Sequence, residues 1–223
     1  MKIRAVITGA TGMVGEGVLH ECLYHPDVES VLSISRRSCG VHHEKLKEIL
    51  HEDFSDFSSL EGALAVCNAG FLCMGVSSVG MSEERYRHLT YGLTMALART
   101  LAKLNRDMTI CYVSGMGTDS SEKGRVMWAR VKGRTENDLL RLPLRGAYLF
   151  RPGFIRPTKG LKHTHWFYRV LDPLFPLLNR AFPGSLLTLR EIGLAMIHSV
   201  GKGPEKRVLE VSDIAIMARK GLS

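Results

Sequence analysis

Long apolar runs are missing from this chain of 223 residues. No stretch reaches the roughly 18 apolar residues that a membrane span requires, so no transmembrane helix is expected. The apolar run that follows Lys2 and Arg4 is interrupted at Thr8-Gly9, which makes it too short for the apolar region of a signal peptide. The sequence therefore predicts a soluble protein.

Paired cysteines and metal-ligand patterns are also missing. The five cysteines are scattered, form no Cys-x-x-Cys pair, and mostly lie within apolar runs, where a thiol behaves as a small hydrophobic group. This excludes a disulfide framework and favours a reducing, cytoplasmic location. His42-His43 lacks a third ligand at a suitable spacing, so no metal site is expected.

Acidic residues are scarce in one stretch. Between Lys123 and Arg169 there are twelve Lys and Arg but only Glu136 and Asp138, within a chain of net charge +8. A solvated basic face, an anionic cofactor or substrate, an acidic surface and nucleic acid are the alternatives. Nucleic acid is not expected, because no recognition motif or aromatic-interleaved basic stripe accompanies the charge.

Short β-rich runs alternate with helical patterns as far as Pro152. We expect strands over residues 2–8, 29–35, 65–74, 108–114 and 146–150, a short helix and a weak strand between 43 and 53, and helices over 13–24, 58–64, 82–101 and 122–140. This alternation predicts an α/β fold with a doubly wound parallel sheet, the Rossmann fold.

The composition changes after Gly153, where prolines and aromatic residues become frequent. Pro157, Pro173, Pro176 and Pro183 break up an apolar segment that cannot be one long helix. We expect a small cap over residues 154–190, closing helices over 189–200 and 212–220, and one dinucleotide-binding domain over 1–223. The Trp166-Phe167-Tyr168 cluster indicates core packing, a homodimer contact or the wall of an apolar substrate pocket.

The first predicted strand leads directly into a glycine-rich turn and a helix. The turn reads Thr8-Gly9-Ala10-Thr11-Gly12-Met13-Val14-Gly15. Gly9 would allow the tight turn, Gly12 would let the backbone approach a pyrophosphate, and Gly15 would let the helix pack close to the strand. The helix N-terminus would offer free N–H groups to the phosphates, so a pyridine dinucleotide is the predicted ligand.

The end of the second predicted strand indicates which dinucleotide. NAD-selective sites usually place a carboxylate there for the ribose hydroxyls, whereas this chain has Ser35-Arg36-Arg37. A guanidinium suits a 2′-phosphate. NADP(H) is therefore preferred, with NAD(H) as the alternative.

These residues resemble the short-chain dehydrogenase/reductase superfamily. The chain is similar to its atypical branch, including the Tat-interacting-protein-like and epimerase/dehydratase-like members. Besides residues 8–15, the resemblance rests on the segments 71–75, 112–114, 131–133 and 151–153, which fall in the family's order. It implies an NAD(P)-dependent oxidoreductase or epimerase.

The resemblance also implies roles for particular residues. Ser114 would polarise a substrate carbonyl, and Lys132 would hold the nicotinamide ribose. Asp53 and Phe54 would lie near the adenine. The remaining cofactor contacts would come from the turn at Thr8, Gly9, Thr11, Gly12, Met13, Val14 and Gly15, from Met74, Gly75 and Val76 along the riboses, and from Pro152, Gly153 and Phe154 beside the nicotinamide.

Trp128 departs from the family's pattern. The catalytic helix of the superfamily carries Tyr-x-x-x-Lys, but this chain has Trp128 four residues before Lys132. An indole N–H does not titrate in the useful range, so Trp128 cannot shuttle a proton as a tyrosine does. The proton would then come from Ser114 with water, or from one of three residues in the cap, His163, His165 and Tyr168.

Two other hypotheses concern the role of Trp128. The protein binds NADP(H) without turnover, as a sensor or scaffold, with Trp128 stacked on the cofactor or filling the substrate space. Alternatively, Trp128 is a packing residue and the chemistry proceeds without a phenol.

The working hypothesis is an NADP(H)-dependent oxidoreductase-like protein acting on a small carbonyl or hydroxyl compound, with an anionic substrate favoured by the basic stretch. A protein that docks on membranes or polyanions is a third alternative.

Overall fold

Seven parallel strands form the central sheet in the computed structural model, which describes residues 1–156, 158, 184–201 and 203–220. Their order is β3-β2-β1-β4-β5-β6-β9, and every neighbouring pair is parallel. The strands are β1 (Ile3–Thr8), β2 (Val28–Ser35), β3 (Leu46–Leu50), β4 (Ala69–Leu72), β5 (Thr109–Val113), β6 (Gly146–Phe150) and β9 (Val208–Leu209). The predicted doubly wound Rossmann architecture is confirmed.

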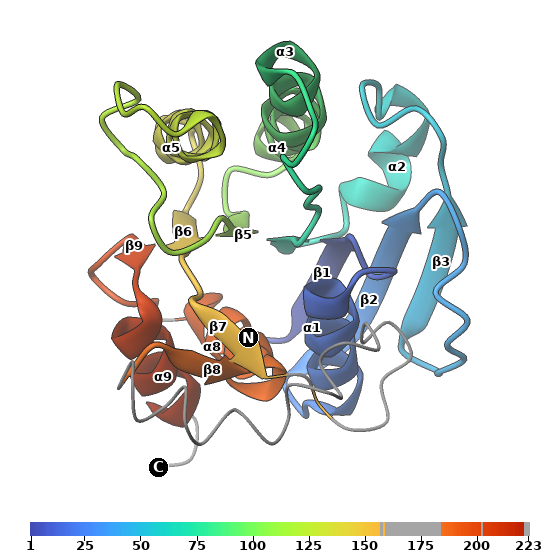
Figure 1. Cartoon of the computed structure of the whole chain (residues 1–223). Coiled ribbons are helices and arrows are strands. Elements are labelled where there is room, and N and C mark those ends of the chain that lie inside the picture. The colour runs from blue at the N-terminus through green and yellow to red at the C-terminus, as the bar shows by residue number, and fades with distance from the viewer. Residues whose placement is uncertain (157, 159–183, 202, 221–223) are drawn as a thin grey trace.

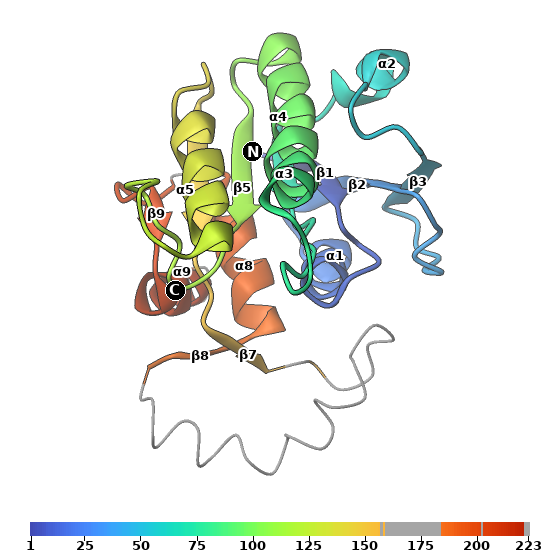
Figure 2. The same ribbon diagram turned by 45° about the horizontal axis from the view of Figure 1, so that its top comes forward.

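Helices cover both faces of this sheet (Figures 1 and 2). One face carries α1 (Met13–Tyr24), α8 (Leu189–Ser199) and α9 (Val211–Arg219), and the other carries α2 (Glu61–Leu64), α4 (Leu93–Leu104) and α5 (Met127–Leu140). The short pieces η1 (Ser58–Leu60), α3 (Glu83–Arg87) and η2 (His88–Gly92) precede α2 and α4. No helix in these described ranges is long and apolar enough to cross a membrane.

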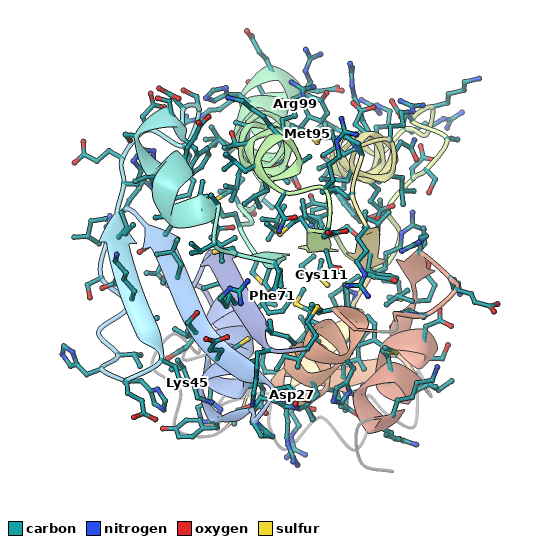
Figure 3. All side chains as sticks on the ribbon, turned by 180° about the vertical axis from the view of Figure 1, so that it is seen from behind. Asp27, Lys45, Phe71, Met95, Arg99 and Cys111 are labelled. Atoms are coloured by element: carbon teal, nitrogen blue, oxygen red, sulfur yellow. The ribbon has the colours of Figure 1, made fainter. Side chains whose placement is uncertain are left out.

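Alternating side chains of the strands pack into two separate apolar cores, one on each face of the sheet. Phe71 and Cys111 are paired across β4 and β5, are fully buried, and lie on the side of α1 and α8, as Figure 3 shows from behind. Leu72 and Tyr112, one residue further along each strand, pack on the opposite side with Met95 of α4. The strands are buried on both faces, which explains their nearly continuous apolar character.

Only the two ends of the predicted cap lie within the described residues. They form a two-stranded parallel ribbon, β7 (Phe154–Arg156) with β8 (Leu186–Thr188). Thr188 then starts α8 with a capping box, in which its hydroxyl accepts the Glu191 N–H and Glu191 binds the Thr188 N–H. The four prolines, the aromatic cluster at 166–168, His163 and His165 lie outside the described residues.

Several predicted boundaries are wrong. In place of the short helix predicted between 43 and 53, the chain makes a turn and then β3. The strand predicted over 65–74 is limited to Ala69–Leu72, because α2 and the turn after it occupy the residues before it.

The helix predicted over 122–140 begins at Met127 instead. Glu122 has a left-handed φ of 60°, and the Asp119 carboxylate accepts the N–H groups of Ser121 and Gly124, so this stretch is a side-chain-stabilised turn.

The turn between β1 and α1 passes unusually close to β4. Gly9 has a φ of 79°, and a Cβ there would lie 2.6 Å from the Cys73 carbonyl oxygen. A Cβ at Gly15 would lie 2.0 Å from the Gly9 carbonyl oxygen, which is backbone and cannot swing away. These two glycines therefore set the position of α1 against the carboxyl ends of β1 and β4.

We expect Gly15→Ala to destabilise the protein by about 2–3 kcal/mol, because the added methyl group must push α1 away from the turn. Urea unfolding followed by circular dichroism measures this. Gly62→Ala is the matched control, since a Cβ at Gly62 of α2 has no described atom within 4 Å. It should be neutral or stabilising by up to about 1 kcal/mol. Equal effects of the two substitutions would contradict the close-approach argument.

Candidate functional site

The N-terminus of α1 presents free backbone donors at the carboxyl edge of the sheet. The Gly12 N–H donates to the Gly9 carbonyl at 2.9 Å, and the Glu16 N–H donates to the Gly12 carbonyl at 2.8 Å. Among the described residues, nothing accepts the N–H groups of Met13, Val14 and Gly15, and no side chain caps the helix. Unpaired N–H groups and the positive end of the helix dipole suit a bound anion.

Gly12 differs from the other two glycines of the turn. Its φ of −110° is open to any residue. Within the described part of the chain, a Cβ there would meet only the Gly9 carbonyl oxygen, at 3.4 Å. Packing within the chain therefore does not require glycine at residue 12. The missing side chain leaves room in front of the free N–H groups, which is where a diphosphate would have to approach.

A cavity of about 490 Å³ opens directly beside this turn. It collects ten of the residues predicted from sequence to contact the cofactor: Gly9, Thr11, Gly12, Ser35, Arg36, Asp53, Phe54, Met74, Gly75 and Val76. Its lining also includes seven residues that the sequence reasoning missed: Ile34, Glu52, Ser55, Cys73, His88, Leu89 and Leu93. The structure brings the ten predicted residues together, and their roles as cofactor contacts remain predictions.

A second, basic hollow adjoins the cavity. It has a volume of about 460 Å³, is lined by Thr11, Arg36, Arg37 and Ser38, and shares Thr11 and Arg36 with the first. The Ser35 hydroxyl donates to the Arg37 carbonyl at 2.6 Å, which fixes the turn that carries both arginines. Both arginine side chains are exposed, so two guanidinium groups face an open space at the end of β2.

The segment after β3, the strand next to β2, adds an acidic and an aromatic residue to the cavity wall. The Asp53 carboxylate accepts the Ser55 hydroxyl at 2.5 Å and the Ser55 N–H at 2.9 Å. These hydrogen bonds hold the pKa of Asp53 below its usual range, so the group stays ionised. Phe54 is buried against Phe57 with ring centroids 5.6 Å apart. A flat ring and an adjacent acceptor are the contacts that an adenine would use.

A π-helical turn shapes the wall of the cavity. Residues His88–Gly92 form this turn between α3 and α4, and His88 and Leu89 from it line the cavity together with Leu93. Such turns often mark functional sites. The sequence pattern indicated one continuous helix here, and nothing in its periodicity shows the extra residue.

Ser114 lies at the end of β5 but does not line the cavity. Its side chain is buried, and its Oγ lies 2.5 Å from Glu136 Oε1 and 3.1 Å from the Phe150 carbonyl oxygen. The single hydroxyl proton is therefore directed toward these two acceptors.

Lys132 reaches the same strand end from α5. Its Nζ donates to the carbonyl oxygen of Ser114. Burial lowers the pKa of Lys132, and the Glu136 carboxylate partly opposes this shift. Trp128 is half-buried one turn earlier on the helix, with its ring centroid 6.0 Å from Nζ.

A buried ion pair, which the sequence reasoning missed, holds this region together. Arg151 Nη2 lies 2.5 Å from Glu136 Oε2, and its Nε lies 3.0 Å from Oε1. The same guanidinium contacts Glu210 Oε1 at 3.2 Å and Ser120 Oγ at 2.5 Å. The end of β6 is thereby tied to α5, to the start of α9 and to the loop after β5. Arg151 had been noted only as part of the 151–153 segment.

The other predicted contacts have mixed surroundings. Thr8 is buried, and its Oγ1 has no hydrogen-bond partner among the described residues. Pro152 is buried and accepts the Met116 N–H, whereas Phe154 is 44% exposed. A Cβ at Gly153 would lie 2.5 Å from the Ser185 carbonyl oxygen, so packing alone accounts for that glycine.

Comparison with known proteins assigns the family. The profile of the NAD dependent epimerase/dehydratase family matches residues 5–122, more than half of the chain, including the glycine-rich turn and every residue that lines the cavity. The chain belongs to this family. The resemblance found in the sequence is confirmed, and with it a nicotinamide-dinucleotide-binding fold of the oxidoreductase and epimerase type.

Solved structures of other enzymes share the fold. The UDP-N-acetylglucosamine 4-epimerase of Methanobrevibacter ruminantium aligns with a TM-score of 0.67 and 19% identity, over 93% of this chain and 76% of the epimerase. The Bordetella bronchiseptica enzyme WbmF, in complex with NAD+, aligns with a TM-score of 0.68 and 12% identity, over 98% of this chain and 78% of WbmF.

Curated relatives correct the predicted location. The mitochondrial protein FMP52 of Candida albicans is 28% identical over 161 residues, which are 70% of this chain and 69% of the relative. The mitochondrial FMP52 of Candida glabrata is 26% identical over 213 residues, covering 92% and 88%. The cytoplasmic location predicted from the cysteines is wrong on this finding, because unpaired thiols indicate a reducing environment but not a particular compartment.

Proposed function

We propose that this protein binds NADP(H) in the cavity beside α1 and uses it to oxidise or reduce a small carbonyl or hydroxyl compound. The observation that carries the proposal is the open space at Gly12 in front of the free N–H groups of Met13, Val14 and Gly15. A diphosphate held there would extend toward Asp53 and Phe54 on one side and toward the end of β5 on the other. A bound nicotinamide would supply hydride chemistry at that end.

Gly12→Ala tests the binding site without disturbing the fold. The added methyl group has room within the chain, so the free energy of unfolding should change by no more than about 1 kcal/mol. The same methyl group would occupy the approach to the N–H groups, so NADPH affinity should fall at least about tenfold, measured by fluorescence titration. Wild-type affinity in Gly12→Ala would contradict the proposal. Gly62→Ala serves as the control that should bind normally.

The basic hollow supports NADP(H) over NAD(H). Arg36 borders both the cavity and the hollow, and Arg37 adds a second guanidinium beside it. A phosphate on the 2′-hydroxyl of the adenosine ribose would add two negative charges at this place. NAD(H) would leave the two arginines with solvent alone.

Arg36→Ala should weaken NADPH binding by about 10- to 100-fold, because a charge-assisted hydrogen bond is lost, and should leave NADH binding nearly unchanged. Parallel titrations of both nucleotides measure this discrimination. Arg99→Ala is the matched control, since Arg99 lies on α4 away from the cavity and is exposed (Figure 3). Tighter binding of NADH than NADPH by the wild type would reject the preference.

The substrate would be small, and the basic stretch from Lys123 onward favours one that carries negative charge. The names of the FMP52 relatives support a mitochondrial site of action. A homodimer remains a prediction that rests on the aromatic cluster at 166–168.

A second candidate function is a catalytically silent NADP(H) sensor. Trp128 favours it, since it stands where the resemblance implies a titrating tyrosine.

Trp128→Tyr separates the two functions, with NADPH consumption followed at 340 nm over a panel of aldehydes and ketones. Turnover by the wild type is the expected result. If the wild type binds NADPH tightly but consumes none, and Trp128→Tyr does consume it, the sensor function is correct.

A further inference from the structure

Reduction of a carbonyl consumes a proton at the oxygen, and most polar groups at the end of β5 are unable to supply one. The indole of Trp128 does not titrate. The hydroxyl proton of Ser114 is directed to Glu136 and to the Phe150 carbonyl. Tyr112 is fully buried on the α4 side of the sheet, and burial raises the pKa of its phenol far above its ordinary value.

Among the described residues, Lys132 is a cationic, titrating group that reaches this place. Its Nζ carries three N–H bonds as an ammonium, and the Ser114 carbonyl oxygen accepts one of them. The residue after Ser114 is Gly115, and a Cβ there would lie 3.8 Å from Nζ. Because residue 115 is glycine, it has no side chain to cover the ammonium. No other described residue accepts the remaining N–H bonds, and Nζ lies at the carboxyl edge of the sheet, where parallel α/β sheets bind their ligands.

The charged groups around Lys132 keep it from forming a permanent ion pair. Glu136 lies one turn further on α5, but Arg151 from the end of β6 binds both of its carboxylate oxygens. Glu210 from the start of α9 binds the same arginine rather than the lysine. Burial is then the main influence on Lys132 and lowers its pKa below the ordinary lysine value.

We propose that the Lys132 ammonium is the proton donor of the reaction, in place of the absent tyrosine. This inference rests on the function proposed above. A bound reduced nicotinamide would supply a hydride to the carbonyl carbon and would itself be oxidised. The electron pair of the C=O π bond would move to the oxygen, and the oxygen would take a proton from Nζ. Lys132 is left as a neutral amine and takes a proton from solvent. In the direction of oxidation the neutral amine accepts the hydroxyl proton.

The first test needs neither cofactor nor a variant. Wild-type protein is labelled briefly with acetic anhydride at pH values from 6 to 11, and modification of each lysine is quantified by mass spectrometry. Only the neutral amine reacts, so Lys132 should become half-reactive at a pH clearly below the ordinary lysine value of about 10.4. Half-reactivity at or above that value would overturn the proposal.

The second test compares Lys132→Arg with Lys123→Arg, a substitution at an exposed loop lysine. Arginine retains the positive charge but cannot release its proton. With 4-nitrobenzaldehyde as the probe, wild-type kcat should fall as pH rises through the Lys132 pKa, because the ammonium is lost. Lys132→Arg should bind NADPH within about threefold of wild type, reduce the aldehyde about 100-fold more slowly and lack this pH limb. Lys123→Arg should behave as wild type.

A wild-type rate and pH limb in Lys132→Arg would overturn the inference and would direct attention to His163, His165 and Tyr168. NADPH fluorescence titration of the same samples separates this result from failure of the proposed function. If NADPH binds and the limb is unchanged, only the role of Lys132 is wrong. If wild-type protein does not bind NADPH at all, the proposed function fails, and this inference fails with it.

Discussion

The contact between the glycine-rich turn and the end of β4 is the constraint on which the rest of the site depends. Because Gly9 lies against the Cys73 carbonyl and Gly15 lies against Gly9, α1 can start only at the carboxyl edge of the sheet. Its first N–H groups then lie next to the part of the turn, Gly9, Thr11 and Gly12, that lines the cavity. Gly9 and Gly15 are required for packing alone, so they would be needed even without a ligand. Gly12 is the residue of the turn whose missing side chain is not explained by packing or by backbone conformation, and the proposed diphosphate site is based on it.

A second constraint organises the other end of the site. The Glu136–Arg151 pair is buried, and breaking such a pair by removing one partner typically costs about 3–5 kcal/mol. It joins α5, the end of β6, the start of α9 and the loop after β5. Glu136 also accepts the hydrogen bond of the Ser114 hydroxyl. With both carboxylate oxygens of Glu136 bound in this way, Lys132 has a backbone carbonyl as its partner. The ion pair therefore sets the electrostatic surroundings of Lys132.

Much of this fold could be predicted from local sequence. The bounds of α1 were predicted to the residue, because Gly12 and Pro26 mark its ends, and the parallel order follows from alternating strands and helices. The ten residues that were predicted as cofactor contacts and that line one cavity follow strand ends, which a Rossmann sheet brings together by topology. The π-helical turn and the Glu136–Arg151 pair were missed. The π-helical turn inserts one extra residue into the helix, which the spacing of apolar residues does not reveal. The Glu136–Arg151 pair joins side chains that are far apart in the local pattern, because they come from separate elements. The mitochondrial relatives could not have been anticipated from residue chemistry.

Amide chemical shifts provide the most direct test of the central claim, that free N–H groups at the start of α1 hold a diphosphate. In 15N-labelled protein titrated with NADP+, the amides of Met13, Val14 and Gly15 should show the largest shift changes, together with Arg36. Saturation at low ligand concentration, with these four amides changing on one binding curve, is the predicted result. If the α1 amides keep their positions while NADP+ is in large excess, the account of this site is wrong.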